Sequence, residues 1–564
     1  MSDGSTLVNV RRALGDKARE ESNPFGDSVF RVEPADLRGV LRLLRDGHGF
    51  DMLLDVTAVD RLELPESSPR FDLVYTLRPA RGGVRVRVHC FAPDDLALDT
   101  VSDLWRSANW AEREVYDQYG VKFRNHPNLK RILNHKDFVG HPLRKDYDIK
   151  KQQWLSEPDD LIDEMEALRA GREDDPDRET VLLNLGPSHP AMHGALRALV
   201  ELEGETIRNT VPEIGYLHRG FEKGAEKGTY TQVIPFTDRL NYCSSVMNNV
   251  GYCRTIEKML GLEITERQQA IRVIILELGR IMDHLVCLAA CLVDVGALTN
   301  YWYLFNERER IYNLVEALCG ARLTHCYFRI GGSSHDLQEG FDTGLEEILR
   351  ELPKALRDVE RLVARNRIFL DRVVGVGEIT PEEAISYGFT GPCLRATGVP
   401  NDLRRDEPYY GYDRYDWDVI VGSRGDTYDR LWVRFEEMVQ SLRIIEQVRR
   451  RIPGGPVNVE DKRVTLPEKR EVHGNIEALM NHFMIIMEGI KPEAGTCYGS
   501  VEAANGELGF FVVSDGTGKP YKVKVRPPCF YMYSAYPRLV QDGLIQDAIA
   551  VLGSLNIIAG ELDR

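Results

Sequence analysis

Two histidines four residues apart mark the stretch with the clearest chemical potential. His189 and His193 lie in LLNLGPSHPAMHG, residues 182–194. Neutral imidazoles can bind a metal ion, and protonated imidazoles can donate protons. Pro190 and Gly194 favour a tight loop over a helix around the two rings. The alternative interpretation is a pair of structural histidines that are hydrogen-bonded within a turn.

Two arginines and a tyrosine follow in the next two polar stretches. Arg219 lies in EIGYLHRGFEKGAE, and Arg239 and Tyr242 lie in PFTDRLNYCSSVMNN. A phenolic O–H can donate a hydrogen bond to a carbonyl oxygen, so Tyr242 is a candidate ligand-binding group. The alternatives are a solvated helix start for the first stretch and an amphipathic core residue for Tyr242.

Acidic residues interrupt the longest helical pattern, which runs from Thr265 to about Asn300 with one apolar face. A buried carboxylate must be paired or have a raised pKa. For Glu277 and Asp283 we expect positions on the solvent face. Asp294, within CLVDVGAL, has apolar neighbours on both sides and is the stronger candidate for a functional carboxylate.

Composition narrows the class of protein. The chain has 564 residues, 43% of them hydrophobic, and a formal net charge of −16. This acidic balance disfavours a nucleic-acid partner, whose affinity would come from Lys and Arg on phosphates. No apolar run is long enough to span a membrane, and the N-terminus lacks the apolar region of a secretory signal. The ten cysteines form no C-x-x-C pair and are expected to be reduced thiols.

The elements that must position these residues fall into a small and a large domain. We expect an α+β domain whose strands at 71–77 and 84–91 are joined at Gly82-Gly83. The large domain is expected to be mainly helical, with a second long helix at 345–367 and a hairpin in FFVVSDGTGKPYKVKV. The expected division is a flexible tail at 1–27, the α+β domain at 28–150, an acidic linker at 151–180 and the helical domain at 181–564.

Several common cofactor motifs are absent from the sequence. There is no G-x-G-x-x-G opening a βαβ unit, no P-loop and no H-E-x-x-H. By these criteria the chain binds neither NAD nor ATP directly. Chemistry that needs a nicotinamide or flavin would then lie on other polypeptides.

Longer motifs carry a resemblance to two subunit families of respiratory complex I, the proton-pumping NADH:quinone oxidoreductase. The large domain resembles the 49-kDa or D subunit, in colinear order, through GPSHPAMHG, HRGFEK, DRLNY, ELGRIMDHL, FNERER, RIGG, SDGTGKPYKVKVRPP and the terminal GELDR. The small domain resembles the 30-kDa or C subunit through AEREVYDQYGVKFRNHPNLKRIL and DFVGHPLRKDY. Together they are similar to the C–D fusion of some bacteria.

The D family is related to the large subunits of nickel–iron hydrogenases, which implies a hydrogenase-like fold for 181–564. Those enzymes hold their metal with two C-x-x-C pairs, because soft thiolates suit nickel and iron. At the corresponding places this chain has a single Cys243 and no cysteine in NIIAGELDR. The resemblance therefore implies no metal on this chain and a cavity that receives a quinone head group instead.

The resemblance assigns roles to the residues singled out above. His193 and Tyr242 match the pair proposed to hydrogen-bond the two quinone carbonyls, and His189 lines the same loop. Asp294 matches the carboxylate thought to pair with that histidine. Arg219 matches an arginine near the terminal iron–sulfur cluster of the B subunit. Arg239 is expected at the same interface with the B subunit.

The chain departs from the D-family pattern at two places. Asn241 precedes the tyrosine where many members have Asp. Thr324 stands where some members have a histidine close to the cluster, with His325 one place off. The pH dependence of the cluster potential is therefore expected to be weaker here than in those relatives.

The resemblance implies a peripheral subunit on the cytoplasmic face of the inner membrane, which helps to pass electrons and protons to quinone. FMN and the iron–sulfur clusters would lie on other subunits. The implied partners are subunits B, I and G and the membrane subunits H and A, with no nucleic acid. The alternatives are a membrane-bound nickel–iron hydrogenase large subunit, disfavoured by the missing thiolates, and a scaffold without a catalytic role.

Overall fold

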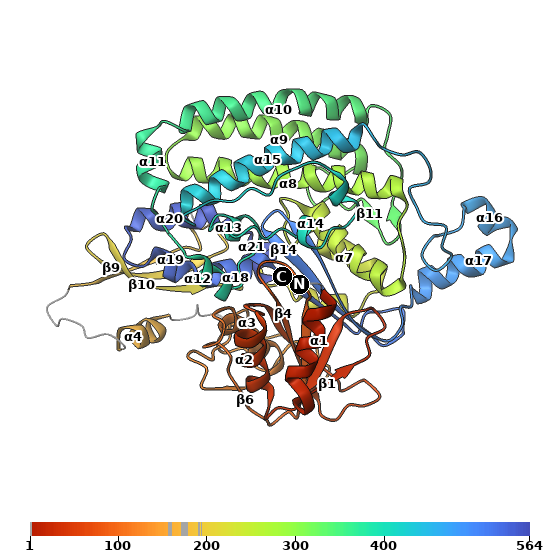
Figure 1. Cartoon of the computed structure of the whole chain (residues 1–564), viewed down its shortest axis with the longest axis horizontal. Helices are drawn as coiled ribbons and strands as arrows, with labels where there is room; N and C mark the ends of the chain where they lie inside the picture. Colours follow the sequence, from red (N-terminus) through yellow and green to blue (C-terminus); the bar gives the residue numbers. More distant parts are fainter. Residues whose placement is uncertain (1–2, 156–160, 171–178, 190–191, 193) are drawn as a thin grey trace.

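The computed structural model describes residues 3–155, 161–170, 179–189, 192 and 194–564. Within that part of the chain, no helix has the length and apolar character needed to cross a lipid bilayer. The architecture is α+β, as the sequence indicates: a small mixed domain lies against a larger, mainly helical body (Figure 1).

The small domain is built on a five-stranded sheet of order β1-β2-β5-β4-β3. Its strands are β1 (Ala18–Glu21), β2 (Ser28–Val32), β3 (Met52–Asp60), β4 (Phe71–Arg78) and β5 (Val86–Ala92). The expected hairpin is confirmed, since β4 and β5 pair antiparallel, whereas β2 and β5 are parallel. Helices α2 (Leu37–His48) and α3 (Ser107–Tyr119) accompany this sheet, and α3 packs on β3.

Residues 3–21 do not form the tail that we expected from their polarity. They form α1 (Asp3–Leu14), a 3-10 turn (Gly15–Lys17) and β1. Val10 and Leu14 are buried in the core of the small domain, with Leu7 packed beside them. The spacing of these three residues gives α1 an apolar face, which packs against α2.

A short segment connects the two bodies. Helix α4 (Ile162–Ala170) lies next to a three-stranded antiparallel sheet of β8 (Val181–Leu185), β9 (Arg197–Glu203) and β10 (Thr206–Glu213). Met165 of α4 is buried with Leu199 and Val211. Part of the stretch that we expected as an acidic linker, residues 151–180, thus forms a helix that packs on this sheet.

The large body is a layer of long helices, seen stacked at the top of Figure 1. These are α8 (Glu266–Asp294), α9 (Leu298–Cys319), α10 (Phe341–Val363) and α15 (Thr427–Arg449), and α7 (Ser245–Leu260) lies below them in this view. Helix α8 packs on both α9 and α15, and its apolar side chains are central to the larger hydrophobic core. Pro353 does not divide α10, which continues on both sides of it.

A second antiparallel sheet joins this layer to the small domain. Its strands are β13 (Gly495–Ala503), β14 (Gly506–Ser514) and β15 (Lys522–Arg526), and the predicted hairpin of β14 and β15 is confirmed. The closing helices are α18 (Pro528–Ser534), α19 (Tyr536–Val540), α20 (Ile545–Leu555) and α21 (Ala559–Asp563).

The remaining elements are short. They are β6 (Leu98–Asp99), β7 (Phe123–Arg124), α5 (Phe221–Ala225), α6 (Tyr230–Thr237), β11 (Phe328–Arg329), β12 (Gly332–Ser333), α11 (Arg367–Val373), α12 (Pro381–Ser386), α13 (Gly391–Arg395), α14 (Leu403–Asp406), a 3-10 turn (Tyr412–Arg414), α16 (Lys469–Gly474), α17 (Ile476–Phe483) and a π turn (Met484–Glu488). Helices α16 and α17 form an arm that projects from the body (Figure 1).

Buried ion pairs and aromatic contacts cross between the two bodies. Lys524 of β15 lies 2.5 Å from Glu114 of α3, and the side chain of Arg564 also contacts Glu114. The ring of Trp110 lies 5.3 Å from that of Phe530, centroid to centroid. One hydrophobic core contains residues of the small domain together with residues of α18–α21. The two bodies therefore share their interior.

Candidate functional site

Tyr242 lies in the turn between α6 and α7. Asn241 shapes this turn, because its side-chain oxygen accepts the backbone N–H of Cys243 at 3.1 Å. The phenol is 37% exposed. Partial burial raises the pKa of Tyr242 to about 12, so the O–H is protonated at neutral pH and available as a donor.

A buried carboxylate fixes the Tyr242 turn to the long helix α8. Asp283 is fully buried and accepts hydrogen bonds on Oδ2 from Asn241 Nδ2 at 2.8 Å and from Ser244 Oγ at 3.0 Å. Its other oxygen accepts Asn556 Nδ2 at 2.6 Å. The expectation that Asp283 faces solvent is therefore wrong, because its partners come from segments distant in sequence.

The last helix, α21, lies directly behind the tyrosine ring. A Cβ at Gly560 would come within 2.7 Å of Arg239 O, 2.8 Å of Leu240 O and 3.3 Å of Tyr242 Cδ1. Only glycine allows so close an approach between these two segments. The next residue, Glu561, is buried and accepts the backbone N–H of Cys529 at 3.1 Å.

Arg219 and Arg239 are both exposed, and both act electrostatically on Asp238. Arg219 donates to Phe236 O at 2.6 Å, and Arg239 lies 3.5 Å from the Asp238 carboxylate. Burial raises the pKa of Asp238 to about 6, although both guanidinium groups oppose this rise. The structure thus brings the two predicted arginines together, next to the Tyr242 turn.

The histidine loop is described only in part. His193 lies outside the described residues, so its expected contacts with Tyr242 and Asp294 stay predictions. His189 begins a turn in which its carbonyl accepts the N–H of Met192 at 3.0 Å.

Asp294 ends α8, where its Oδ2 lies 3.3 Å from the position of a Cβ on Gly553 of α20. Its partial burial there raises its pKa to about 6, although much of the side chain stays exposed. It lies eleven residues beyond Asp283, or about 16 Å along the helix axis.

His325 points into the helical body. Its Nδ1 lies 3.3 Å from Ser245 Oγ, and the ring packs edge-on against Tyr312. Burial lowers its pKa to about 4, so the ring is neutral. The residue before it, Thr324, takes a left-handed backbone conformation, with φ +34.

All ten cysteines are free thiols. In the part of the chain that the structure describes, no three His, Cys, Asp or Glu side chains converge as a metal site.

Comparison with known proteins identifies the family. The family model for the respiratory-chain NADH dehydrogenase 49 Kd subunit matches residues 294–564, and that for the 30 Kd subunit matches residues 30–153. The C/D subunit of NADH-quinone oxidoreductase from Bdellovibrio bacteriovorus is 48% identical over 99% of this chain and 100% of its own length. The chain belongs to the C/D subunit family of NADH-quinone oxidoreductase.

Two further relatives show how this family is arranged. The C/D subunit of Acidiphilium cryptum is 40% identical over 94% of this chain and 92% of its own length. The D 1 subunit of Sorangium cellulosum is 50% identical, but it covers only 68% of this chain while 96% of its own length is matched. The large body of the C/D subunit thus also occurs in a protein that is named as a D subunit alone.

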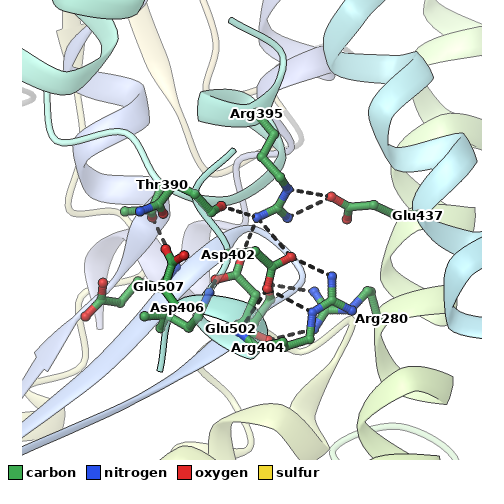
Figure 2. A network of polar contacts seen from close by, with 12 residues as sticks. Arg280, Thr390, Arg395, Asp402, Arg404, Asp406, Glu437, Glu502 and Glu507 are labelled. Carbon is green, nitrogen blue, oxygen red and sulfur yellow. Dashed lines mark hydrogen bonds and ion pairs between the residues drawn. The ribbon is translucent and has the colours of Figure 1, made fainter. Parts of the chain in front are cut away.

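Behind the site, the C/D subunit holds a buried network of charged side chains (Figure 2). Arg395 of α13 contacts Glu437 of α15 at 2.7 Å and Glu502 of β13 at 2.8 Å. Arg404 of α14 contacts Asp402 at 2.7 Å and Glu277 of α8 at 3.2 Å. Like Asp283, Glu277 is buried rather than solvent-facing.

The network reaches the Tyr242 turn through α8. His284 Nε2 lies 2.9 Å from Glu437 Oε2, and His284 directly follows Asp283 in the chain. Burial alone would raise the pKa of Glu437, but the Arg395 guanidinium lowers this pKa below its usual value. The sequence signal for these residues was the run of ionisable groups in α8, whereas Gly560 and Glu561 were marked only as part of the terminal motif GELDR, without a role.

Proposed function

We propose that this C/D subunit forms the quinone-reduction site of a proton-translocating NADH:quinone oxidoreductase, together with a partner that carries the terminal iron–sulfur cluster. Electrons would reach that cluster from NADH through FMN and further clusters on other subunits. The names of the relatives support the overall reaction. The partners proposed are subunits B, I and G and the membrane subunits H and A, on the cytoplasmic side of the inner membrane.

The observation that carries the proposal is the placement of Tyr242. A protonated phenol is partly exposed on a turn that is fixed from behind by Asp283 and Gly560. Reduction of a quinone places negative charge on its oxygens, and a fixed donor stabilises that charge without reorganising. Tyr242 would donate to one carbonyl oxygen, with His193 on the other.

The neighbouring residues have supporting roles in this proposal. His193 would deliver a proton to the quinone. Asp294 would orient the His193 ring and respond to the change in charge of that ring. Coupling to proton translocation would begin with this change in charge. His189 would line the same loop. Arg219 and Arg239 would face the partner's cluster, where positive charge favours the reduced form.

The replacement Tyr242→Phe tests the proposal in the assembled complex. Removing one positioned donor should lower the NADH-driven quinone reductase rate on the order of 100-fold. Oxidation of NADH by an artificial acceptor that takes electrons before the site should be unchanged. Tyr428→Phe is a matched control, because Tyr428 is also a partly buried tyrosine, on α15, with a pKa raised by burial. It should keep full activity.

Two results would overturn the proposal. A normally assembled Tyr242→Phe complex with full quinone reductase activity would favour a scaffold role. Stoichiometric nickel in the purified chain would favour the hydrogenase alternative.

A further inference from the structure

Glu561 is a buried carboxylate that the reaction proposed above does not use. Its side chain is 1% exposed. Oε1 accepts the N–H of Cys529 at 3.1 Å, whereas Oε2 is buried and has no N–H or O–H donor among the described residues. The Cys529 thiol, a weak donor, also hydrogen-bonds to this carboxyl group. A buried carboxylate oxygen without a donor disfavours the ionised form.

Glu561 directly follows the glycine that packs against the Tyr242 ring. Gly560 packs against the Tyr242 ring and against the carbonyl groups of Arg239 and Leu240. Cys529, which holds Glu561 through its backbone, lies close enough to Tyr242 to affect the pKa of the phenol. Cys529 thus neighbours both groups, and Glu561 is buried, so a charge on the ring or on a molecule bound to it would act on Glu561 with little screening by water.

The groups around Glu561 leave its charge weakly compensated. Asp283 on α8 and the thiols of Cys529 and Cys243 face the same region, and Arg526 of β15 is the cation that acts on it. Arg526 is already engaged, because it donates to Thr390 Oγ1 and to the carbonyls of Leu54, Gly388 and Glu507. Burial raises the pKa of Glu561 to about 7.

We propose that Glu561 is a redox-linked proton site: its carboxylate binds one proton from solvent when negative charge arrives on the molecule held at Tyr242, and releases it when the neutral product leaves. This rests on the proposed function, in which that molecule is a quinone and its electrons come from the partner's cluster. One O–H bond forms at Glu561 and later breaks, and Glu561 itself is neither oxidised nor reduced. The physical cause is electrostatic, since a nearby negative charge favours the protonated acid.

The test uses the complete complex with Glu561→Gln, which keeps the shape but cannot titrate. Reduced-minus-oxidised infrared difference spectra of the wild-type complex should show a carboxylic-acid C=O band that appears on reduction and shifts in D₂O. Glu561→Gln should lack that band. Glu112→Gln is the matched control, because Glu112 is a buried carboxyl in the small domain with a pKa of about 8; it should keep the band.

The pH profile of the rate gives a second readout. At saturating quinone, the wild-type kcat should change with an inflection near pH 7. Glu561→Gln should lose this inflection with KM altered less than about twofold, and Glu561→Asp should shift it rather than abolish it. Glu561→Asp also separates the loss of titration from a folding defect.

The outcomes distinguish this inference from the proposed function. If the band and the inflection persist in Glu561→Gln while Tyr242→Phe loses activity, the proton site is refuted and the quinone site stands. If Tyr242→Phe is also fully active, the quinone site itself is refuted.

Discussion

Two buried groups of carboxylates lie near α8, and their surroundings differ. Around Arg395, the carboxylates of Glu437, Glu502 and Asp402 each face a guanidinium group (Figure 2). Behind Tyr242, among the described residues, Asp283 accepts hydrogen bonds from neutral donors, and one oxygen of Glu561 has no N–H or O–H donor. A compensated charge is fixed in one ionisation state, whereas an uncompensated one can change with its surroundings. Glu437 in the first group therefore suits holding the fold, and Glu561 in the second suits titration during turnover.

The largest effect is expected for Arg395→Met, which tests whether the charges around Arg395 stabilise the fold. It would leave Glu437 and Glu502 buried without their shared cation, so we expect a loss of about 3–5 kcal/mol in the free energy of unfolding. Thermal or denaturant unfolding of the isolated C/D chain would measure it. An unfolding free energy within about 1 kcal/mol of wild type would mean that water or another cation reaches the network.

Gly560→Ala tests the other region by moving the tyrosine. The added Cβ would clash with Arg239 O and Leu240 O, which should lower stability by about 1–3 kcal/mol. We expect the quinone reductase rate to fall further than the stability loss explains, since Tyr242 is displaced. Gly224→Ala is a control on α5, where a Cβ would meet nothing within 4 Å. Equal activity losses in both variants would argue against a special role for Gly560.

The pH dependence of stability should have opposite signs in the two regions. The pKa of Glu437 is lowered, so its contribution is present at neutral pH and is lost as pH falls through the folded-state pKa. The pKa of Glu561 is raised to about 7, so it penalises folding increasingly as pH rises from about 4.5 to above 7.

Relative to wild type, Glu437→Gln should therefore be least stable at neutral pH. Glu561→Gln should gain stability relative to wild type between pH 5 and 8, by about 1.4 kcal/mol for each pKa unit of the shift. Unfolding midpoints in urea from about pH 2 to pH 8 would measure both slopes, because the Glu437 contribution changes only below its unfolded-state pKa of about 4.5. Parallel slopes in the two variants would contradict the distinction.

The smallest expected effect on stability comes from an ion pair on the surface. Arg443 contacts Asp416 and Asp418, all largely exposed. Arg443→Gln should change the free energy of unfolding by less than about 1 kcal/mol, because solvent and salt screen exposed charges. A loss as large as that of Arg395→Met would mean that burial is not what separates these ion pairs.

Much of the fold followed from local patterns. The hairpins at β4–β5 and β14–β15 and the long helix α8 have clear periodicity in the sequence. The burial of Glu277 and Asp283 could not be predicted in this way. Their partners include Arg404, Tyr412 and Ser441 for the first, and Asn241, Ser244 and Asn556 for the second.

Residues 3–21 show that composition can also hide a regular element. Their charged composition suggested a tail, but three apolar residues at helical spacing are sufficient for α1 to pack on α2. Glu561 was recognisable only as part of a terminal motif. Its unpartnered oxygen depends on how α21 packs beneath Cys529 and Tyr242, which no local pattern encodes.

The shared interior of the two bodies bears on why they occur as one polypeptide. Arg78 and Arg85 of the small domain contact Glu507 of β14. Conversely, Lys524 of the large body contacts Glu114 of the small domain. These non-covalent contacts join the halves through their cores, independently of the peptide that runs between them. Fusion then serves mainly to fix a one-to-one ratio and a high local concentration. Two separately synthesised halves should dock into the same structure.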